Sequence, residues 1–341
     1  MKLSTIKDCY MIAEIGVNHG GSVETALKMI DAAKDSGADA VKFQTFKASS
    51  LVSLNTPKVE YQMSTTDKSE THYEMIKALE FKYEDHKPVF DYCKSKEIDF
   101  ISTPYDIESA KFLDDLGVET FKTASADIVD LPLHEFLAST NKNVIISTGM
   151  STIDEIKNVL SIYSKKNSNN IAILHCVANY PCAYKSLNLN VIKTMQDLFG
   201  ITTGYSDHAI GPYPAVAAIA MGAKIIEKHF TLNKDMPGPD HKASITPNEF
   251  RDLVTAVRVC EESLGKNKKF VQDEEKQMRE VSRKSLFFNK DIQKGEIINE
   301  NDLVLKRPGT GIYSIFLKDV IGKILLKDVY KDKMVEYGDF E

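Results

Sequence analysis

The feature that most constrains the fold of this chain is a regular alternation of short apolar runs with longer amphipathic segments between residues 10 and 231. Eight such runs, alternating with helices over roughly 250 residues, are typical of a (β/α)₈ TIM barrel. A doubly wound open sheet is the main alternative, but it usually has fewer strands and a glycine-rich nucleotide turn, and no GxGxxG sequence follows the first run. The runs predict strands over residues 10–15, 40–45, 99–103, 120–123, 143–147, 170–175, 201–205 and 224–228.

The amphipathic segments predict helices. Residues 23–36 carry apolar side chains on one helical face. A helix over 153–163 is preceded by Ser151-Thr152-Ile153-Asp154, which resembles a capping box with Asp in place of Glu. The long polar segment 62–90 predicts an extended connection and a candidate lid, with a helix at 72–79. Further helices are expected at 212–221 and 247–264.

The character of the chain changes after residue 264, so we expect residues 1–264 to form the barrel domain. Residues 265–281 are charged and poor in apolar side chains, which predicts a linker. Beyond it, residues 283–288 and 302–306 predict strands on either side of a turn at 291–296. Residues 282–341 are therefore expected to form a small β-rich domain of about 60 residues, near the lower size at which domains fold alone.

Charge and cysteine content argue against several functional classes. The formal net charge is −6 without a basic tail or stripe, so neither nucleic acid nor an anionic membrane is an expected partner. No apolar run reaches the ~20 residues of a membrane span, and no secretory signal opens the sequence, which predicts a cytoplasmic protein. Five cysteines without a CxxC pair indicate reduced thiols.

Two histidines, His208 and His229, stand at the ends of neighbouring predicted strands. Because the carboxyl ends of parallel barrel strands meet at one face, both rings should point to one place. Two imidazoles, completed by oxygen atoms and water, suit Mn²⁺ or Mg²⁺ better than a closed zinc site. Asp207 and Glu227 are interpreted either as partners that orient the rings or as structural ion pairs.

Other polar residues stand at the same strand ends. Glu14 lies in an apolar strand, where a carboxylate is costly unless it is paired. Lys42 and Gln44 share one strand face, and Lys122 lies near the end of the fourth strand. Two lysines and several hydroxyls at one barrel mouth predict a cradle for a phosphorylated carboxylic acid. The hydroxyls are those of Thr103, Ser125 and Ser147; Asp240 is a candidate ligand for sugar hydroxyls, and His19 and His175 are expected to be structural.

Taken together, these segments resemble the sialic acid synthase family, the bacterial N-acetylneuraminate and legionaminate synthases. The similarity covers nearly the whole chain, and the ordered set of motifs is specific. In the C-terminal module, Lys306-Arg307-Pro308-Gly309-Thr310-Gly311 resembles the family's antifreeze-like (SAF) domain. The other matching strings are Ala13-Glu14-Ile15-Gly16-Val17-Asn18-His19, Lys42-Phe43-Gln44-Thr45, Ser102-Thr103-Pro104, Ser147-Thr148-Gly149-Met150, Ser206-Asp207-His208, Glu227-Lys228-His229-Phe230 and Gly238-Pro239-Asp240-His241.

The resemblance implies a TIM barrel joined to the antifreeze-like domain, in a homodimer in which that domain of one subunit covers the barrel of the other. It implies condensation of phosphoenolpyruvate with an N-acetylated hexosamine, and a divalent cofactor, Mn²⁺ first and Mg²⁺ or Co²⁺ as alternatives. Glu14 would act near the aldehyde or the attacking water, and Arg307 of the partner subunit would bind the N-acetyl end of the sugar. The resemblance assigns Lys42, Thr103, Lys122, Ser125, Ser147 and Ser206 to phosphoenolpyruvate, Gln44, Tyr180 and Asp240 to the sugar, and His208 and His229 to the metal.

Two positions depart from the family pattern and bear on the sugar more than on the reaction. Ser125-Ala126-Asp127 stands where the family often has Ser-Gly-Glu, and Ala178 stands where some neuraminate synthases place an amide. The expected acceptor is N-acetylmannosamine, giving N-acetylneuraminate. The alternative is 2,4-diacetamido-2,4,6-trideoxymannose, giving N,N'-diacetyllegionaminate.

Two interpretations compete with this one. A heptulosonate or octulosonate synthase would need further cations for the second phosphate of its phosphosugar, and the C-terminal module with Arg307 argues against it. A non-catalytic polysaccharide-binding protein would need neither the lysines nor the histidines at the strand ends.

Overall fold

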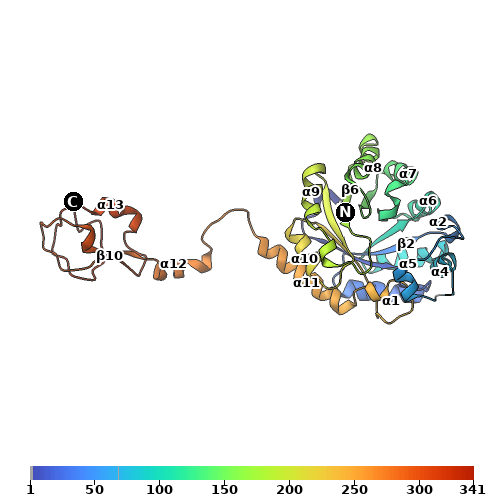
Figure 1. Ribbon diagram of the computed structural model, residues 1–341, viewed down its shortest axis with the longest axis horizontal. Helices are drawn as coiled ribbons and strands as arrows, with labels where there is room; N and C mark the ends of the chain where they lie inside the picture. Colours follow the sequence, from blue (N-terminus) through green and yellow to red (C-terminus); the bar gives the residue numbers. More distant parts are fainter. Residues whose placement is uncertain (1–2, 68) are drawn as a thin grey trace. The chain divides into compact units, whose positions relative to one another are not determined.

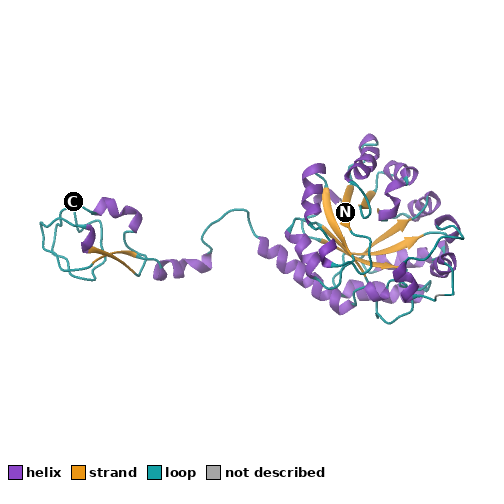
Figure 2. Ribbon diagram, in the orientation of Figure 1, coloured by secondary structure: helices purple, strands orange, loops and turns teal. Residues whose placement is uncertain are grey.

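The computed structural model describes residues 3–67 and 69–341 and divides the chain into two compact units, Met1–Gly265 and Lys266–Glu341. In the first unit, eight parallel strands close into a barrel in chain order, and helices surround it (Figures 1 and 2). The predicted barrel and its eight strands are confirmed, with strand ends that shift by at most two residues. The strands are β1 (Tyr10–Gly16), β2 (Ala40–Thr45), β3 (Asp99–Pro104), β4 (Thr120–Thr123), β5 (Asn143–Ser147), β6 (Ile171–Cys176), β7 (Thr202–Asp207) and β8 (Ile225–His229).

The five helices predicted for the first unit begin and end within two residues of the predicted positions, and the helix expected at 72–79 has those same bounds. The predicted cap of the helix after β5 was wrong by one residue. Its N-cap is Thr152 rather than Ser151, and Glu155 accepts a hydrogen bond from the Thr152 backbone N–H at 2.7 Å. The capping box therefore uses a true Glu at its third position. The helices are α1 (Val23–Asp35), α2 (Ala48–Leu51), α3 (Glu60–Thr65), α4 (His72–Leu79), α5 (Tyr83–Ser95), α6 (Ile107–Leu116), α7 (Leu131–Ser139), α8 (Ile153–Lys165), α9 (Asn190–Phe199), α10 (Tyr213–Ala220) and α11 (Pro247–Leu264).

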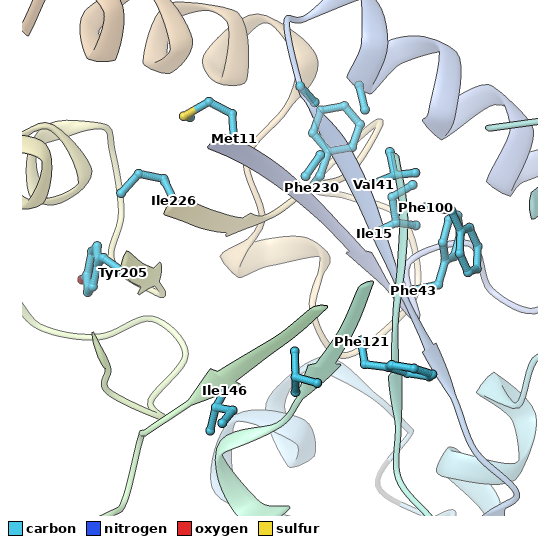
Figure 3. Close-up of a cluster of buried hydrophobic side chains, with 14 of the residues drawn as sticks. Met11, Ile15, Val41, Phe43, Phe100, Phe121, Ile146, Tyr205, Ile226 and Phe230 are labelled. Atoms are coloured by element: carbon cyan, nitrogen blue, oxygen red, sulfur yellow. The ribbon is translucent and has the colours of Figure 1, made fainter. Parts of the chain in front are cut away.

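Alternation along each strand divides the barrel residues between two environments. Every second side chain packs outward against the helices, and Figure 3 shows this layer with Phe43, Phe121 and Ile226 among its members. Lower in the barrel, inward apolar side chains, Ile12 and Ile145 among them, belong to one buried cluster. We call this cluster the floor of the barrel. Above the floor the inward side chains become polar, and this upper layer forms the candidate site.

The second unit has its own apolar core, which includes Leu286, Phe288 and Val329. Its two strands, β9 (Ser285–Phe288) and β10 (Leu303–Lys306), pair antiparallel. The short helix α13 (Leu317–Val320) follows β10, and α12 (Lys276–Ser282) lies in the segment that the sequence indicated as a linker. Across both units, none of the described helices combines the length and the apolar character needed to cross a membrane.

Candidate active site at the mouth of the barrel

Four charged side chains from β1, β2, β4 and β8 lie inside the barrel mouth: Glu14, Lys42, Lys122 and Glu227. Each is at most 5% exposed. Strand alternation explains their position, because Glu14 and Glu227 stand two residues beyond Ile12 and Ile225 of the floor and share their inward face. Four charges in a dry interior are stable only if they compensate one another.

The four charges form one network. The Lys42 Nζ lies 2.8 Å from Glu14 Oε2, and Lys122 Nζ donates to Ser147 Oγ at 2.6 Å. Glu227 accepts a hydrogen bond from Ser206 Oγ at 2.8 Å. Its other oxygen lies 3.8 Å from Lys42 Nζ and 3.7 Å from Lys122 Nζ. Glu227 is therefore shared by the two lysines, whereas Glu14 is paired closely with one.

The two carboxylates differ in proton affinity. Burial raises the pKa of Glu14 to about 6, and the single close ammonium group of Lys42 offsets only part of that effect. Burial also disfavours the charged form of Glu227, but Lys122 and Lys42 together outweigh it and lower the pKa of Glu227 to about 2. One site thus contains a carboxylate that stays ionised and another that is able to take up a proton near neutral pH.

Further polar groups are held in place around this network. Lys42 donates to Thr103 Oγ1 at 3.3 Å, and Gln44 donates to Glu14 Oε1 at 3.1 Å. Ser125 Oγ accepts a hydrogen bond from the backbone N–H of Gly149 at 3.0 Å. A Cβ at Gly149 would come within 2.7 Å of that oxygen, so only glycine lets the loop after β5 approach the serine this closely.

The two predicted histidines do come together. The ring centroids of His208 and His229 are 5.6 Å apart, and Tyr180 packs against both rings, with centroids at 4.1 and 5.5 Å. His208 Nδ1 lies 2.9 Å from the Val177 carbonyl oxygen. A backbone carbonyl, rather than Asp207 or Glu227, therefore orients this ring. Asp207 instead pairs with Lys228 at 2.6 Å, which supports its interpretation as a structural ion pair.

The nitrogen atoms of this pair fit a divalent cation. His229 Nδ1 is buried and, among the described residues, has no hydrogen-bond partner. Burial, followed by His208 and Lys42, lowers the pKa of His229 well below its usual value, which keeps the ring in the neutral form that binds metals. Asp240 Oδ2 lies 4.0 Å from His229 Nδ1. Within residues 3–67 and 69–341 no group of three or more His, Cys, Asp or Glu side chains is arranged to hold a metal alone. A cation here would need oxygen ligands from water or substrate.

All of these groups line one cavity of about 390 Å³ above the floor, within the size range of small-molecule sites. One wall is apolar and comes from α2, α4 and their surroundings: Leu51, Val52, Met75, Ile76 and Leu79. The predicted site residues of the barrel all line this cavity, namely Glu14, Lys42, Gln44, Thr103, Lys122, Ser125, Ser147, Tyr180, Ser206, His208, His229 and Asp240.

The remaining sequence predictions fall outside the cavity. Arg307 lies in the second unit, directly after β10, and its side chain is exposed. His19 Nδ1 accepts a hydrogen bond from Gly21 N–H, and His175 Nε2 lies 2.6 Å from the Leu187 carbonyl oxygen, as expected of structural histidines.

Two features of the cavity were not predicted. Glu227 was interpreted either as a partner that orients the imidazoles or as a structural ion pair, and the structure places its carboxylate between Lys42 and Lys122. Its position two residues before His229 was the signal that its side chain points inward. Cys176 also lines the cavity, with Sγ 3.5 Å from Ser125 Oγ. It ends β6 just as Ser147 ends β5, so the same rule of strand ends could have found it.

A closed (β/α)₈ barrel with buried lysines, ionisable carboxylates and an imidazole pair in one cavity at the carboxyl ends of its strands defines a TIM-barrel enzyme for an anionic substrate. Comparison with known proteins narrows this class. The NeuB family model matches residues 29–269, and the SAF domain model matches residues 283–341. The chain belongs to the NeuB family, the sialic acid synthases.

Named relatives agree with this assignment. The chain is 41% identical to an N,N'-diacetyllegionaminic acid synthase of Campylobacter jejuni over 97% of this chain and 99% of that one. It is 33% identical to the N-acetylneuraminate-9-phosphate synthase of Homo sapiens, over 96% and 93% of the two chains. A solved N-acetylneuraminic acid synthetase of Leptospira borgpetersenii, crystallised with citrate, matches with a TM-score of 0.73 and 34% identity, covering 80% of this chain and 90% of that one. The protein is thus an enzyme, a transferase of the sialic acid-type synthases, and the non-catalytic interpretation is set aside.

Proposed function

We propose that the enzyme condenses phosphoenolpyruvate with an N-acetylated hexosamine and water, giving a nine-carbon 3-deoxy-2-keto acid and phosphate. The observation that supports this most directly is that a buried lysine pair and an imidazole pair line the same cavity. The lysines suit the carboxylate and phosphate of one substrate, and the imidazoles face the place where the aldehyde of the other must lie.

In this proposal Lys42 and Lys122 bind the two anionic groups of phosphoenolpyruvate, and their existing contacts with Thr103 and Ser147 fix the direction of each ammonium group. Ser125 and Ser206 add hydroxyl donors to the same substrate. Because existing hydrogen bonds already position these groups, they stabilise charge that develops during the reaction without having to reorganise.

His208 and His229 would hold a divalent cation, with Mn²⁺ as the first choice and Mg²⁺ or Co²⁺ as alternatives. When bound, such a cation polarises the aldehyde of the open-chain sugar. Gln44, Tyr180 and Asp240 then orient the sugar, and Asp240 lies beside the imidazole pair, where a sugar hydroxyl would reach it.

The reaction balances as follows. C3 of phosphoenolpyruvate attacks the aldehyde carbon and forms the new C–C bond, the aldehyde oxygen takes up one proton to become a hydroxyl, and C2 is left cationic. Water adds to C2 and loses one proton, which balances the proton gained by the aldehyde oxygen. The tetrahedral intermediate then expels phosphate by C–O cleavage, and the proton of its C2 hydroxyl leaves with the phosphate as the keto group forms. Glu14 is placed to accept the proton of that water, since Gln44 and Lys42 orient its carboxylate. A carboxylate with a raised pKa is the better base for this step.

Two acceptors are candidates. N-acetylmannosamine would give N-acetylneuraminate. The diacetamido-trideoxy hexose, which would give N,N'-diacetyllegionaminate, is supported by the 41% identity to the Campylobacter jejuni synthase. The apolar wall from Leu51 to Leu79 supports it as well, because an acetamido methyl and a 6-deoxy methyl both gain from apolar contact.

The proposal extends to a homodimer in which Arg307 of the partner subunit binds the N-acetyl end of the sugar. In the test, the full-length protein is incubated with Mn²⁺, phosphoenolpyruvate and a panel containing both acceptors and an acceptor without an acetamido group. We expect phosphate release and a nine-carbon keto acid, identified by mass, from at least one acetamido sugar. Phosphate release without a condensation product, or no reaction with any sugar, would count against the proposal.

A further inference from the structure

Glu227 is a buried charged group of the cavity to which the proposed reaction gives no task. Its side chain accepts a hydrogen bond from Ser206 through one oxygen. The other oxygen has no hydrogen-bond partner among the described residues, although it is fully enclosed. That oxygen faces the ammonium groups of Lys42 and Lys122 at 3.8 and 3.7 Å.

These distances distinguish Glu227 from an ordinary ion pair. Direct N–H···O contacts to a carboxylate are about 2.7–2.9 Å, and Lys42 makes such a contact at 2.8 Å with Glu14, not with Glu227. Lys122 makes its short contact with Ser147. Glu227 therefore supplies negative charge to both lysines without occupying the hydrogen-bonding positions that a bound anion would use.

The charge of Glu227 affects how tightly the two lysines can bind an anion. Within the network of Glu14, Lys42, Lys122 and Glu227, two lysines and two carboxylates cancel when Glu14 is ionised, so this network has no net positive charge with which to retain an anion. Without Glu227 this network would carry a net positive charge, and an anion beside the two buried ammonium groups would be bound more tightly. In the proposed reaction the enzyme binds one phosphorylated anion and must release phosphate, so weaker binding of both anions allows faster turnover.

We propose that Glu227 is a built-in counter-anion that limits the affinity of Lys42 and Lys122 for phosphorylated ligands, so that substrate and product phosphate are bound weakly enough to turn over. The inference rests on the proposed function, because it takes the ligand to be an enol phosphate. Glu227 acts through the lysines and is therefore a positioning residue. Any carboxylate on the inward face of β8 at this depth would do the same, whereas an amide would not.

The test compares the wild-type chain with Glu227→Gln and Glu227→Asp in direct binding of inorganic phosphate and of phosphoenolpyruvate by calorimetry, without acceptor sugar and with metal chelated. Removing a charge about 4 Å from both lysines should tighten binding of both ligands by at least about tenfold in Glu227→Gln. Glu227→Asp, whose carboxylate is withdrawn from the lysines, should show a smaller tightening. Unchanged or weaker binding would overturn the inference and would indicate that Glu227 only orients the lysine side chains.

Kinetics provide a second readout that a structural role would not produce. In Glu227→Gln the KM for phosphoenolpyruvate should fall together with kcat, because tightly held phosphate leaves slowly. A fall in kcat with a raised KM would contradict the inference. If Glu227→Gln does not fold, as judged by circular dichroism, phosphate binding by Glu227→Asp decides the question: tighter binding supports the inference, and unchanged or weaker binding contradicts it.

The chain offers a matched control in Asp339, a buried carboxylate between Lys327 and Lys333 in the second unit. Asp339→Asn removes the same charge from a similar setting outside the barrel cavity and should leave phosphate binding unchanged. If wild-type protein binds neither phosphoenolpyruvate nor phosphate, the proposed function itself fails. If it binds them and Glu227→Gln does not tighten binding, only the counter-anion inference fails.

Discussion

Two buried carboxylates, Glu227 in the barrel and Asp339 in the second unit, each lie between two lysines, yet the two clusters are built differently. Asp339 makes short contacts, 2.5 Å to Lys333 Nζ and 2.8 Å to Lys327 Nζ, and accepts a backbone hydrogen bond from Glu336 at 2.9 Å. Its lysines reach solvent, with side chains 31% and 50% exposed. Around Glu227 the lysine side chains are at most 5% exposed and stay 3.7 Å or more away.

The difference separates a structural cluster from a functional one. The Asp339 carboxylate has short partners on both oxygens, and water takes up the remaining charge of its lysines, so this cluster ties together chain segments of the second unit. The lysines at Glu227 are buried, and the carboxylates of Glu14 and Glu227 compensate their charge. Their ammonium groups also line the cavity, where a bound anion could reach them.

The largest expected effect tests whether the barrel lysines bind phosphate independently of the imidazole pair, as a functional cluster should. Removing metal with a strong chelator, or replacing His229 with Ala, should reduce condensation to background, because the proposed cation held by the imidazole pair is the group that would polarise the sugar aldehyde. Phosphate binding, measured by calorimetry on the same samples, should persist, since the lysines hold the anion. Full turnover under strict chelation, or loss of phosphate binding together with activity, would contradict this division of tasks.

A second prediction compares lysines from the two clusters directly. Lys122→Met should lower kcat/KM for phosphoenolpyruvate by about 10²–10³-fold, the usual cost of losing one preorganised group that stabilises charge. Lys333→Met, the corresponding change beside Asp339, should leave kcat/KM unchanged. Steady-state kinetics on both variants, with circular dichroism to confirm folding, measures the contrast. Equal losses in the two variants would mean that the barrel cluster is no more functional than the other.

The sequence predicts some of these features and not others, for identifiable reasons. Strand positions and the inward direction of Glu14, Lys42 and His229 follow from local alternation, which residue order determines. Contacts across the barrel do not, because they depend on strand tilt and register. The sequence therefore left Glu227 either as a partner of the nearby imidazoles or as a structural ion pair, and did not indicate that it faces Lys42 and Lys122 from other strands.

The second unit shows the same limit more strongly. Its two strands could be predicted from apolar runs, but nothing in the charged segment 327–341 distinguishes Asp339 from neighbouring acids on the surface. The side chain is buried because the chain returns to the core there, with Leu325 paired to Phe340. Burial of this kind depends on how distant segments pack together, and the spacing of apolar residues along the sequence does not predict it.

A third prediction concerns the stability of the second unit. Asp339→Asn should destabilise it by about 2 kcal/mol, because the variant loses charge-assisted hydrogen bonds at a buried position. Hydrogen exchange followed by mass spectrometry on the full-length chain should detect faster exchange in peptides from residues 283–341, with barrel peptides unaffected. Unchanged exchange in those peptides would show that the short contacts of Asp339 contribute nothing to folding.

The smallest expected effect is an acid dependence of the stability of the second unit. Burial alone would raise the pKa of Asp339, but its lysines and the Glu336 N–H outweigh burial and lower it below 3.8. A carboxylate whose pKa is lower in the folded state stabilises fully above its unfolded value and loses that contribution as the pH falls through the folded value. Exchange in residues 283–341 of the wild-type chain should therefore accelerate, after correction for intrinsic rates, only below about pH 4. In Asp339→Asn this added acceleration should be absent, because the Asn side chain does not titrate. An identical acid limb in the two proteins would assign the effect to other carboxylates of the unit, such as Asp302, which pairs with Lys290 at 2.8 Å.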